Sequence, residues 1–404
     1  MDIQQIRQDF PILTERVYNH PLVYLDNAAT TQKPQCVIDR IVAAYTHCNA
    51  NIHRGVHYMS LRATEYHEQA RQTVADFISA ASPEDIVFTR GTTEAINLAA
   101  FSYGEQFVHE GDEIIVSQAE HHSNFVPWQM LCERKHAVLR VIPLLDNGHL
   151  DMQAFSRMLC DRTRLVAVAH VSNVTGIINP VDEIIRMAHE RGIHVLIDGA
   201  QSAPHLPIDV QRMDCDFFAF SAHKLYGPAG VGVLYGRHDL LDQMPPYQGG
   251  GEMIKTVTIN RTTYNELPYK FEAGTPDYVG STALAEAIRY IRQIGWEQIE
   301  QHEAGLVRYA EQRIREIDGV RVIGETDHRI GVISFVVEGT HPYDVGELLD
   351  KLGFAVRTGH HCAQPLIDRY ALPGTVRISF GIYNTHDEID AFAAALKRVV
   401  SMLR

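Results

Sequence analysis

The sequence has 404 residues, of which 45% are hydrophobic and 21% are charged, a composition typical of a folded globular protein large enough for two domains. With 50 acidic and 36 basic residues the formal net charge is −14, and no run of Lys or Arg occurs, which argues against a basic nucleic-acid-binding surface. No apolar stretch of about 18 residues predicts a membrane-spanning helix, and the start MDIQQIRQDFPIL lacks the pattern of a secretory signal. The six cysteines are scattered without a CxxC pair, which favours reduced thiols in a cytoplasmic protein.

The middle of the chain alternates short apolar runs with helical patterns. Seven runs predict strands, at residues 85–89, 113–117, 139–144, 164–171, 194–198, 216–220 and 230–235. Segment 181–192 is typical of a helix that ends at Gly192. Continuous apolar strands separated by helices predict an α/β fold with a mostly parallel seven-stranded sheet, covered by helices on both faces.

A second unit follows. Residues 280–295 have helical periodicity, strands are expected at 331–337, 354–358 and 375–381, and helical patterns occupy 341–353 and 385–403. We therefore expect a large domain over residues 21–280, a smaller α+β domain over 281–404, and an N-terminal segment, residues 1–20, that packs on the smaller domain. Active-site loops should lie at the carboxyl ends of the parallel strands and between the domains.

Lys224 and Asp198 each follow an apolar strand. Taken alone, Lys224 in FFAFSAHKLYGP is more often a surface lysine whose stem covers apolar neighbours; the functional interpretation is an amine that forms a Schiff base with an aldehyde cofactor. Asp198 in HVLIDGAQS is either a turn residue or the carboxylate that pairs with the pyridinium nitrogen of pyridoxal phosphate. Gln201 could then donate to the phenolic oxygen of that cofactor. The two strand ends together raise the probability of a cofactor site.

A phosphate group would fit the segment FTRGTTEAINLAA, where a strand ends, a Gly-Thr-Thr turn follows and a helix starts near Glu94. Free N–H groups and the hydroxyls of Thr92 and Thr93 at a helix start bind phosphate, although a plain threonine cap would look the same. Ser221 and His223, just before the lysine, could complete such a cradle.

Two further strand ends carry polar side chains. His121 in SQAEHHSNFVPW could cover the cofactor ring and move protons, or could be an ordinary hydrogen-bonded loop histidine. Asn173 in HVSNVTGIINP could contact the phenolic oxygen or the substrate.

The segment RTGHHCAQPL places Cys362 directly after His360 and His361. A zinc site or a regulatory zinc module is one interpretation, and a nucleophilic thiol is another. Adjacent histidines point in different directions on an extended chain, and a fourth ligand at a suitable spacing is missing, so the sequence predicts no metal here.

The stretches VYLDNAATTQKP, RGTTEAINL, AEHHSN, HVSNVTG, DGAQ, FSAHKLYGP, FEAGTP and RTGHHCA together resemble the class V, fold-type-I pyridoxal-phosphate enzymes, and among them the cysteine desulfurases. The resemblance covers about residues 10–400, with the motifs in the expected order. The short loop at 357–363 is similar to that of the SufS-type, or group II, subgroup, whose members are also known as selenocysteine lyases.

The resemblance assigns roles to matching positions. It implies that pyridoxal 5'-phosphate is held by Lys224 as a Schiff base and by Asp198, Gln201, His121, Thr92, Thr93, Ser221, His223 and, from the partner subunit of a homodimer, Thr275. It implies that the substrate faces Asn173, Arg357 and Arg377, the last as a bidentate carboxylate clamp, and that His53 lines the site of the neighbouring subunit.

The activity implied is removal of sulfur from L-cysteine, or selenium from L-selenocysteine, with Lys224 and His121 moving protons and Cys362 becoming a persulfide. The resemblance further implies transfer of that sulfur to a SufE- or SufU-type acceptor and a scaffold for iron–sulfur cluster assembly. Alternatives are a cysteine sulfinate desulfinase, another class V lyase or hydrolase, or an aminotransferase, which would not need Cys362.

Overall fold

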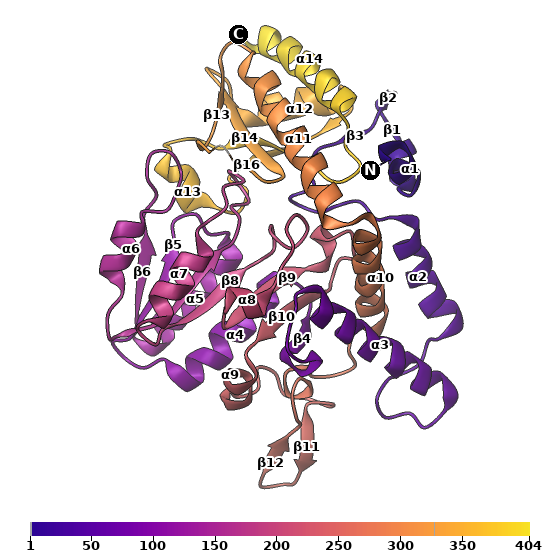
Figure 1. Cartoon of the computed structure of the whole chain (residues 1–404), viewed down its shortest axis with the longest axis vertical. Coiled ribbons are helices and arrows are strands. Elements are labelled where there is room, and N and C mark those ends of the chain that lie inside the picture. The colour runs from indigo at the N-terminus through magenta and orange to yellow at the C-terminus, as the bar shows by residue number, and fades with distance from the viewer. Residues whose placement is uncertain (1, 327) are drawn as a thin grey trace.

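The structure, a computed structural model, describes residues 2–326 and 328–404 and is built around a seven-stranded sheet (Figure 1). In spatial order the strands are β4 (Ile86–Thr89), β10 (Gly232–Gly236), β9 (Phe217–Ser221), β8 (His194–Asp198), β7 (Thr163–Ala169), β5 (Glu113–Ser117) and β6 (Val138–Ile142). β10 is antiparallel to both of its neighbours, and all other neighbouring pairs are parallel. The prediction of a mostly parallel seven-stranded sheet is confirmed.

Helices cover both faces of this sheet because successive strand side chains point to opposite sides and nearly all are apolar. One face, with Ile114 and Val116, packs against α4 (Thr92–Phe107) and α5 (Val126–Lys135). The other face, with Ile115 and Val195, packs in a cluster that includes residues of α3 (Tyr58–Phe77), α6 (Met152–Met158), α7 (Val181–His189) and α10 (Tyr278–Ile294). Apart from the edge strands β6 and β4 the sheet is therefore buried, which leaves its strand ends as the places where polar side chains can gather.

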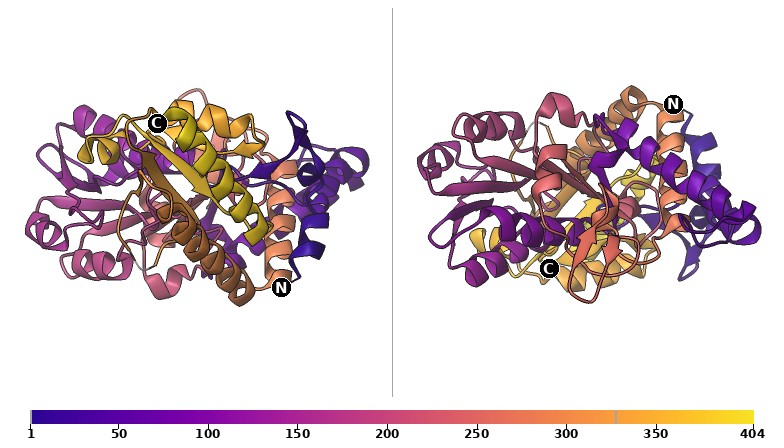
Figure 2. Two further views of the ribbon diagram at one scale, coloured as in Figure 1. Left: turned by 90° about the horizontal axis from the view of Figure 1, so that it is seen from above. Right: turned by 90° about the horizontal axis from the view of Figure 1, so that it is seen from below.

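A second, smaller sheet has the order β13 (Val320–Val322), β14 (Val332–Val337), β17 (Thr375–Ser379) and β16 (Arg357–Gly359), and all its pairs are antiparallel. It shares an apolar core with α11 (Trp296–Arg315), α12 (Pro342–Asp350) and α14 (His386–Leu403). α11 and α14 lie side by side over this end of the molecule, as the left view of Figure 2 shows.

The N-terminal segment crosses to this smaller unit. After α1 (Ile3–Gln8), β1 (Arg16–Val17) and β2 (His20–Pro21), strand β3 (Val23–Tyr24) pairs in parallel with β15 (Phe354–Ala355). Arg7 forms an ion pair with Glu388 at 2.8 Å, and the Phe10 ring packs on Tyr383. α2 (Gln35–His47) then leads back to the large sheet and packs, like α3, against α10.

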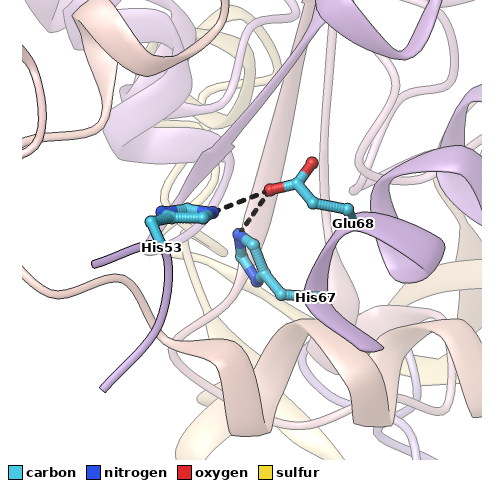
Figure 3. Close-up of side chains that lie close together, drawn as sticks. All are labelled: His53, His67 and Glu68. Atoms are coloured by element: carbon cyan, nitrogen blue, oxygen red, sulfur yellow. Dashed lines mark hydrogen bonds and ion pairs between the residues drawn. The ribbon is translucent and has the colours of Figure 1, made fainter. Parts of the chain in front are cut away.

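The remaining elements are short. They are α8 (Val210–Met213), α9 (His238–Gln243), α13 (Gln364–Arg369), the projecting hairpin of β11 (Ile254–Val257) and β12 (Thr262–Tyr264) at the bottom of Figure 1, and 3-10 turns at Pro11–Thr14, Pro83–Asp85, His122–Asn124, Ala222–Lys224 and Tyr269–Phe271. Among the described residues, no helix combines the length and the apolar character needed to cross a bilayer.

Three local predictions differ from the structure. The expected strand 354–358 is two strands, β15 and β16, because its halves pair with different partners, β3 and β17. α4 begins at Thr92 rather than near Glu94, since Gly91 already serves as its N-cap. α7 ends at His189, and Gly192, with φ +66°, lies in the turn that follows instead of capping the helix.

Candidate active site

Polar side chains meet in one cavity of about 180 Å³ at the edge of the large sheet. β4, β5, β7, β8 and β9 all run in the same direction, so the residues that follow them lie at one edge. The small unit closes the cavity with its own side chains. Of the residues predicted from the sequence, the cavity is lined by Thr92, Thr93, His121, Asn173, Asp198, Gln201, Ser221, His223, Lys224, Arg357, Cys362 and Arg377.

Lys224 ends the 3-10 turn that follows β9 and faces this cavity. Desolvation lowers the pKa of its amine to about 8, an effect that Arg377 and Arg357 reinforce and Asp198 opposes. Asp198, the last residue of β8, is 5% exposed and accepts a hydrogen bond from the Ala200 N–H at 2.9 Å. Burial raises the pKa of this carboxyl, so its ionised form needs a cationic partner in the cavity.

The start of α4 forms a cradle of donors. Gly91 adopts φ +154°, which a side chain would disfavour, and the Thr92 N–H donates to Ser221 Oγ at 2.8 Å. The Thr92 and Ser221 hydroxyls are 2.7 Å apart. A β carbon on Gly232 would lie 2.3 Å from Gly91 Cα, so only glycine lets β10 approach this turn. The first turn of α4, a 16-residue helix, therefore offers backbone N–H groups and two hydroxyls, which suit a phosphate.

His121 follows β5 at the cavity wall. The Ser123 N–H donates to His121 Nδ1 at 3.1 Å, which places the ring proton of the neutral form on Nε2. Burial and the neighbouring Lys224 amine lower the pKa of His121 to about 3, so the ring is neutral at physiological pH. His121 can therefore donate a hydrogen bond from Nε2 and is a weak base.

Cys362 lies on a strained loop that is hydrogen-bonded to residues at the ends of the large sheet's strands. His361 and Cys362 both adopt left-handed backbone conformations, with φ +52° and +56°. Asn173 Nδ2 donates to the His361 carbonyl at 2.7 Å, and the His122 N–H donates to the Cys362 carbonyl at 2.6 Å. The Cys362 side chain is exposed at the rim of the cavity, where a substrate or a partner protein can reach it.

The two histidines before Cys362 differ. His360 is exposed, whereas His361 is 5% exposed and its Nε2 lies 2.7 Å from the Thr375 hydroxyl. Burial, with the nearby arginines, lowers the pKa of His361 to about 2, so it carries no charge beside the thiol. His361 Nε2 is engaged by Thr375, and among the described residues these three side chains are not grouped as candidate metal ligands.

Two arginines of the small unit border the same cavity. Arg377, 2% exposed, donates to Asp26 Oδ1 and to the Asn173 carbonyl, both at 3.0 Å. Its Nε is buried and has no hydrogen-bond partner among the described residues. Arg357 is more exposed and lies 3.9 Å from Asp26 Oδ2. This arrangement leaves guanidinium donors available for an anion.

The side chains in this cavity fit pyridoxal phosphate, the cofactor that the sequence resemblance implies. An amine, a buried carboxylate and a phosphate cradle stand at three strand ends, and they suit the aldehyde, the pyridinium nitrogen and the phosphate of that group, respectively. Gln201 donates to the Ala28 carbonyl at 2.9 Å, while its buried Oε1 has no partner among the described residues. A buried polar atom without a partner is costly and indicates a group missing from its surroundings.

His53 and Thr275 do not line this cavity. Thr275 is exposed and borders a second cavity, of about 400 Å³, with Arg90 and Gln248. His53 lies beside Glu68 and His67, as Figure 3 shows, with His53 Nε2 3.0 Å from Glu68 Oε1. The prediction that both residues serve a neighbouring subunit is not tested by a single chain.

The three side chains of Figure 3 are close enough to hold a metal ion, but Arg71 opposes this. Its guanidinium donates to His67 Nε2 at 3.1 Å and to both Glu272 oxygens at 2.6 and 2.9 Å. An ion on His67 would have to displace this permanent cation. The cluster is instead a buried charge network that joins α3 to the segment before Thr275.

Sequence reasoning missed the groups that fix the backbone before Lys224. The His223 carbonyl accepts from the Thr31 N–H at 2.9 Å, from the Thr30 hydroxyl at 3.0 Å and from Lys33 Nζ at 3.1 Å. Asp26 was also missed. These residues belong to the quoted stretch VYLDNAATTQKP, whose position beside Lys224 is visible only in three dimensions.

Comparison with known proteins places these observations in context. A family model described as aminotransferase class-V matches residues 23–392. A cysteine desulfurase of Dickeya dadantii is 51% identical over 402 residues, covering 99% of this chain and 97% of the relative. The structure of the cysteine desulfurase CsdA from Escherichia coli superposes with a TM-score of 0.93 at 38% identity, covering 100% of both chains.

Some relatives are longer. A probable cysteine desulfurase of Mycolicibacterium paratuberculosis is 50% identical over 398 residues, yet this chain spans 58% of its length, and 65% of that of a relative from Mycobacterium leprae.

Proposed function

This chain belongs to the class-V aminotransferase family, and we propose that it is a cysteine desulfurase that converts L-cysteine to L-alanine and a protein-bound persulfide. Its cofactor is pyridoxal phosphate. One observation carries the proposal: an exposed thiol, Cys362, stands at the rim of the cavity that also contains Lys224 and Arg377. A transaminating enzyme has no use for a thiol there.

Lys224, Asp198 and His121 handle the proton chemistry. The bound pyridoxal ring draws electrons from the substrate α carbon and so makes its hydrogen acidic. Lys224 holds the cofactor and then accepts that proton through its amine, whose neutral form is populated near neutral pH because its pKa is about 8. Asp198 keeps the pyridinium nitrogen protonated. His121, neutral with its proton on Nε2, would lie over the ring and donate a hydrogen bond from Nε2, and the proton that Lys224 takes up would be the one returned.

Arg377 and Cys362 handle the substrate. Arg377 binds the α-carboxylate through donors that the protein leaves free, which turns the β carbon and its sulfur toward the thiol. Cys362, as a thiolate, forms a bond to the substrate sulfur while the carbon–sulfur bond breaks. The electron pair of that bond remains on the β carbon, which takes up a proton and leaves as part of alanine.

The test is the Cys362→Ala variant incubated with L-cysteine. Alanine and transferred sulfur should both fall to background, while the absorption of the bound cofactor stays as in the unchanged protein. Cys160→Ala, which removes a partly exposed thiol outside the cavity, is the matched control and should retain full turnover. Alanine formation at the original rate in Cys362→Ala would contradict the mechanism.

We further propose membership of the SufS-type subgroup, with selenocysteine lyase activity, on the basis of the short loop Arg357–Ala363. The exposure of Cys362 supports sulfur transfer to a SufE- or SufU-type acceptor that feeds a cluster scaffold. The six cysteines are free in the described part of the chain, which suits a cytoplasmic enzyme. Alanine formation from L-cysteine and L-selenocysteine, with and without each acceptor, measures the selenocysteine lyase activity and the response to each acceptor.

A homodimer is the assembly we propose, with His53 and Thr275 completing the partner's cavity. Both residues lie outside the cavity of their own chain, and Val56 and Tyr58, near His53, are 96% and 72% exposed apolar side chains that a partner could cover. Light scattering measures the mass. Mixing inactive Lys224→Ala subunits with weakened Thr275→Ala subunits should restore activity if each mixed dimer contains one complete site.

A further inference from the structure

One carboxylate, Asp26, pairs with both arginines of the cavity. Its Oδ1 accepts from Arg377 Nη2 at 3.0 Å, and its Oδ2 lies 3.9 Å from Arg357 Nη1. Asp26 is not among the side chains that line the cavity, so it approaches the guanidinium groups from the protein side. It neutralises part of the positive charge that the two arginines direct at a ligand.

The position of Asp26 is fixed by its backbone. Its main chain forms an isolated parallel bridge with Ser379, two residues beyond Arg377 on β17. Its carbonyl accepts from the Ala29 and Thr30 N–H groups at 3.1 and 3.3 Å. A carboxylate held in this way is part of the framework rather than a mobile counter-ion that a substrate would displace.

Arg377 is oriented by this contact. Asp26 and the Asn173 carbonyl each take one guanidinium N–H, on Nη2 and Nη1, while the buried Nε has no partner in the described part of the chain. A guanidinium fixed at two nitrogens presents its remaining donors in one direction only. The site is therefore prepared for one carboxylate, held at Arg377.

The charge balance matches a substrate with a single anionic group. The two arginines contribute two positive charges and Asp26 one negative charge, which leaves about one uncompensated positive charge for the ligand. A second anionic group on the β carbon would enter a cavity in which Asp26 already balances part of the arginine charge. An uncharged thiol or selenol on the β carbon meets no such penalty.

We propose that Asp26 is a positioning and specificity-determining residue, which orients Arg377 and makes the site prefer amino acids with one carboxylate over those with a second anionic group on the β carbon. This inference rests on the proposed function, since it concerns the same site. It acts through the arginines, and Asp26 itself touches neither substrate nor cofactor.

The test uses the cofactor-loaded enzyme and two ligands that need no desulfuration, L-alanine and L-aspartate. Each is titrated while the absorption of the bound cofactor is recorded, which gives two dissociation constants and their ratio. In Asp26→Asn the ratio should move about tenfold in favour of L-aspartate, the size expected for one charge lost a few ångströms behind a guanidinium. Asp39→Asn, which removes an exposed carboxylate on α2, should leave the ratio unchanged.

Asp26→Glu separates charge from folding. Asp26→Glu keeps the negative charge, so it should retain the preference for L-alanine within about twofold. This variant can be measured even if Asp26→Asn leaves the buried Arg377 unpaired and yields no folded protein. Equal changes of both dissociation constants in Asp26→Asn, or loss of the preference in Asp26→Glu, would overturn the proposal. Because neither ligand loses sulfur, these outcomes are independent of whether Cys362→Ala abolishes cysteine turnover.

Discussion

Replacement of Asn173 by alanine should release the loop that carries Cys362. The Asn173 amide donates to the His361 carbonyl at 2.7 Å, and this contact crosses from the large sheet to the small unit. The substitution leaves the main-chain carbonyl of Asn173 in place, so its contact with Arg377 survives. The change therefore removes the restraint on the loop without removing a contact of the proposed carboxylate clamp.

The expected loss of rate follows from the backbone strain in this loop and the hydrogen bond that balances it. Left-handed backbone conformations at His361 and Cys362 cost roughly 1–2 kcal/mol each. A buried carbonyl left without its donor costs about 1–3 kcal/mol, so loss of the Asn173 amide removes much of what balances that strain. If the whole cost falls on the step in which Cys362 reacts, the rate drops by about 5- to 150-fold.

Rapid quenching of a single turnover measures this step as alanine formed per subunit, and steady-state kinetics gives KM separately. We expect a slower single turnover in Asn173→Ala with KM and the cofactor absorption close to those of the unchanged protein. Asn147→Ala, which alters an exposed asparagine, is the control. A normal single-turnover rate with a raised KM would show that Asn173 contacts the substrate and would refute the argument from the loop.

Three other results are expected. The rate at which the α-deuterium of L-alanine exchanges should rise with pH up to about 8 and level off above it, because the neutral amine of Lys224 is the base. The rate is measured in Cys362→Ala to exclude titration of the thiol, and a flat profile would contradict this expectation. Glu272→Gln should lower the free energy of unfolding by about 3–5 kcal/mol because it leaves the buried Arg71 partly unpaired. The melting temperature should fall accordingly, whereas the control Glu133→Gln, at an exposed site, should leave it unchanged. Removal of the cofactor should lower the free energy of unfolding by about 2.7 kcal/mol relative to protein with the cofactor at a hundredfold excess over Kd, seen as a lower melting temperature, and an unchanged melting curve would argue against its binding to the folded chain.

The large sheet was predictable because its strands are short, continuous apolar runs, a local signal. β5 and β8 have the bounds expected from sequence. The polar residues at their ends, among them His121 and Asp198, could be expected to meet because parallel strands end at one edge. The structure brings them to one cavity.

Contacts between distant segments could not be predicted. The break at Val356 depends on two different partner strands, and neither is encoded near that residue. Asn173 was expected to face substrate, which stays a prediction; its amide also binds the His361 carbonyl in the loop of Cys362, a contact between residues 188 positions apart that the sequence does not reveal. Asp26 carries no local pattern that would mark it as a partner of two arginines. Such assignments require the packing of the two units.

The pairing of β3 with β15 has a consequence for synthesis of the protein. β3 leaves the ribosome long before β15, its only strand partner in the described part of the chain. The edge of β3 must therefore remain unpaired while the residues between the two strands emerge, and the small unit cannot be completed before β15 has been made. An early, exposed strand edge is a site where nascent chains aggregate or recruit chaperones, so truncated chains that stop before residue 354 should depend on such factors far more than the finished enzyme.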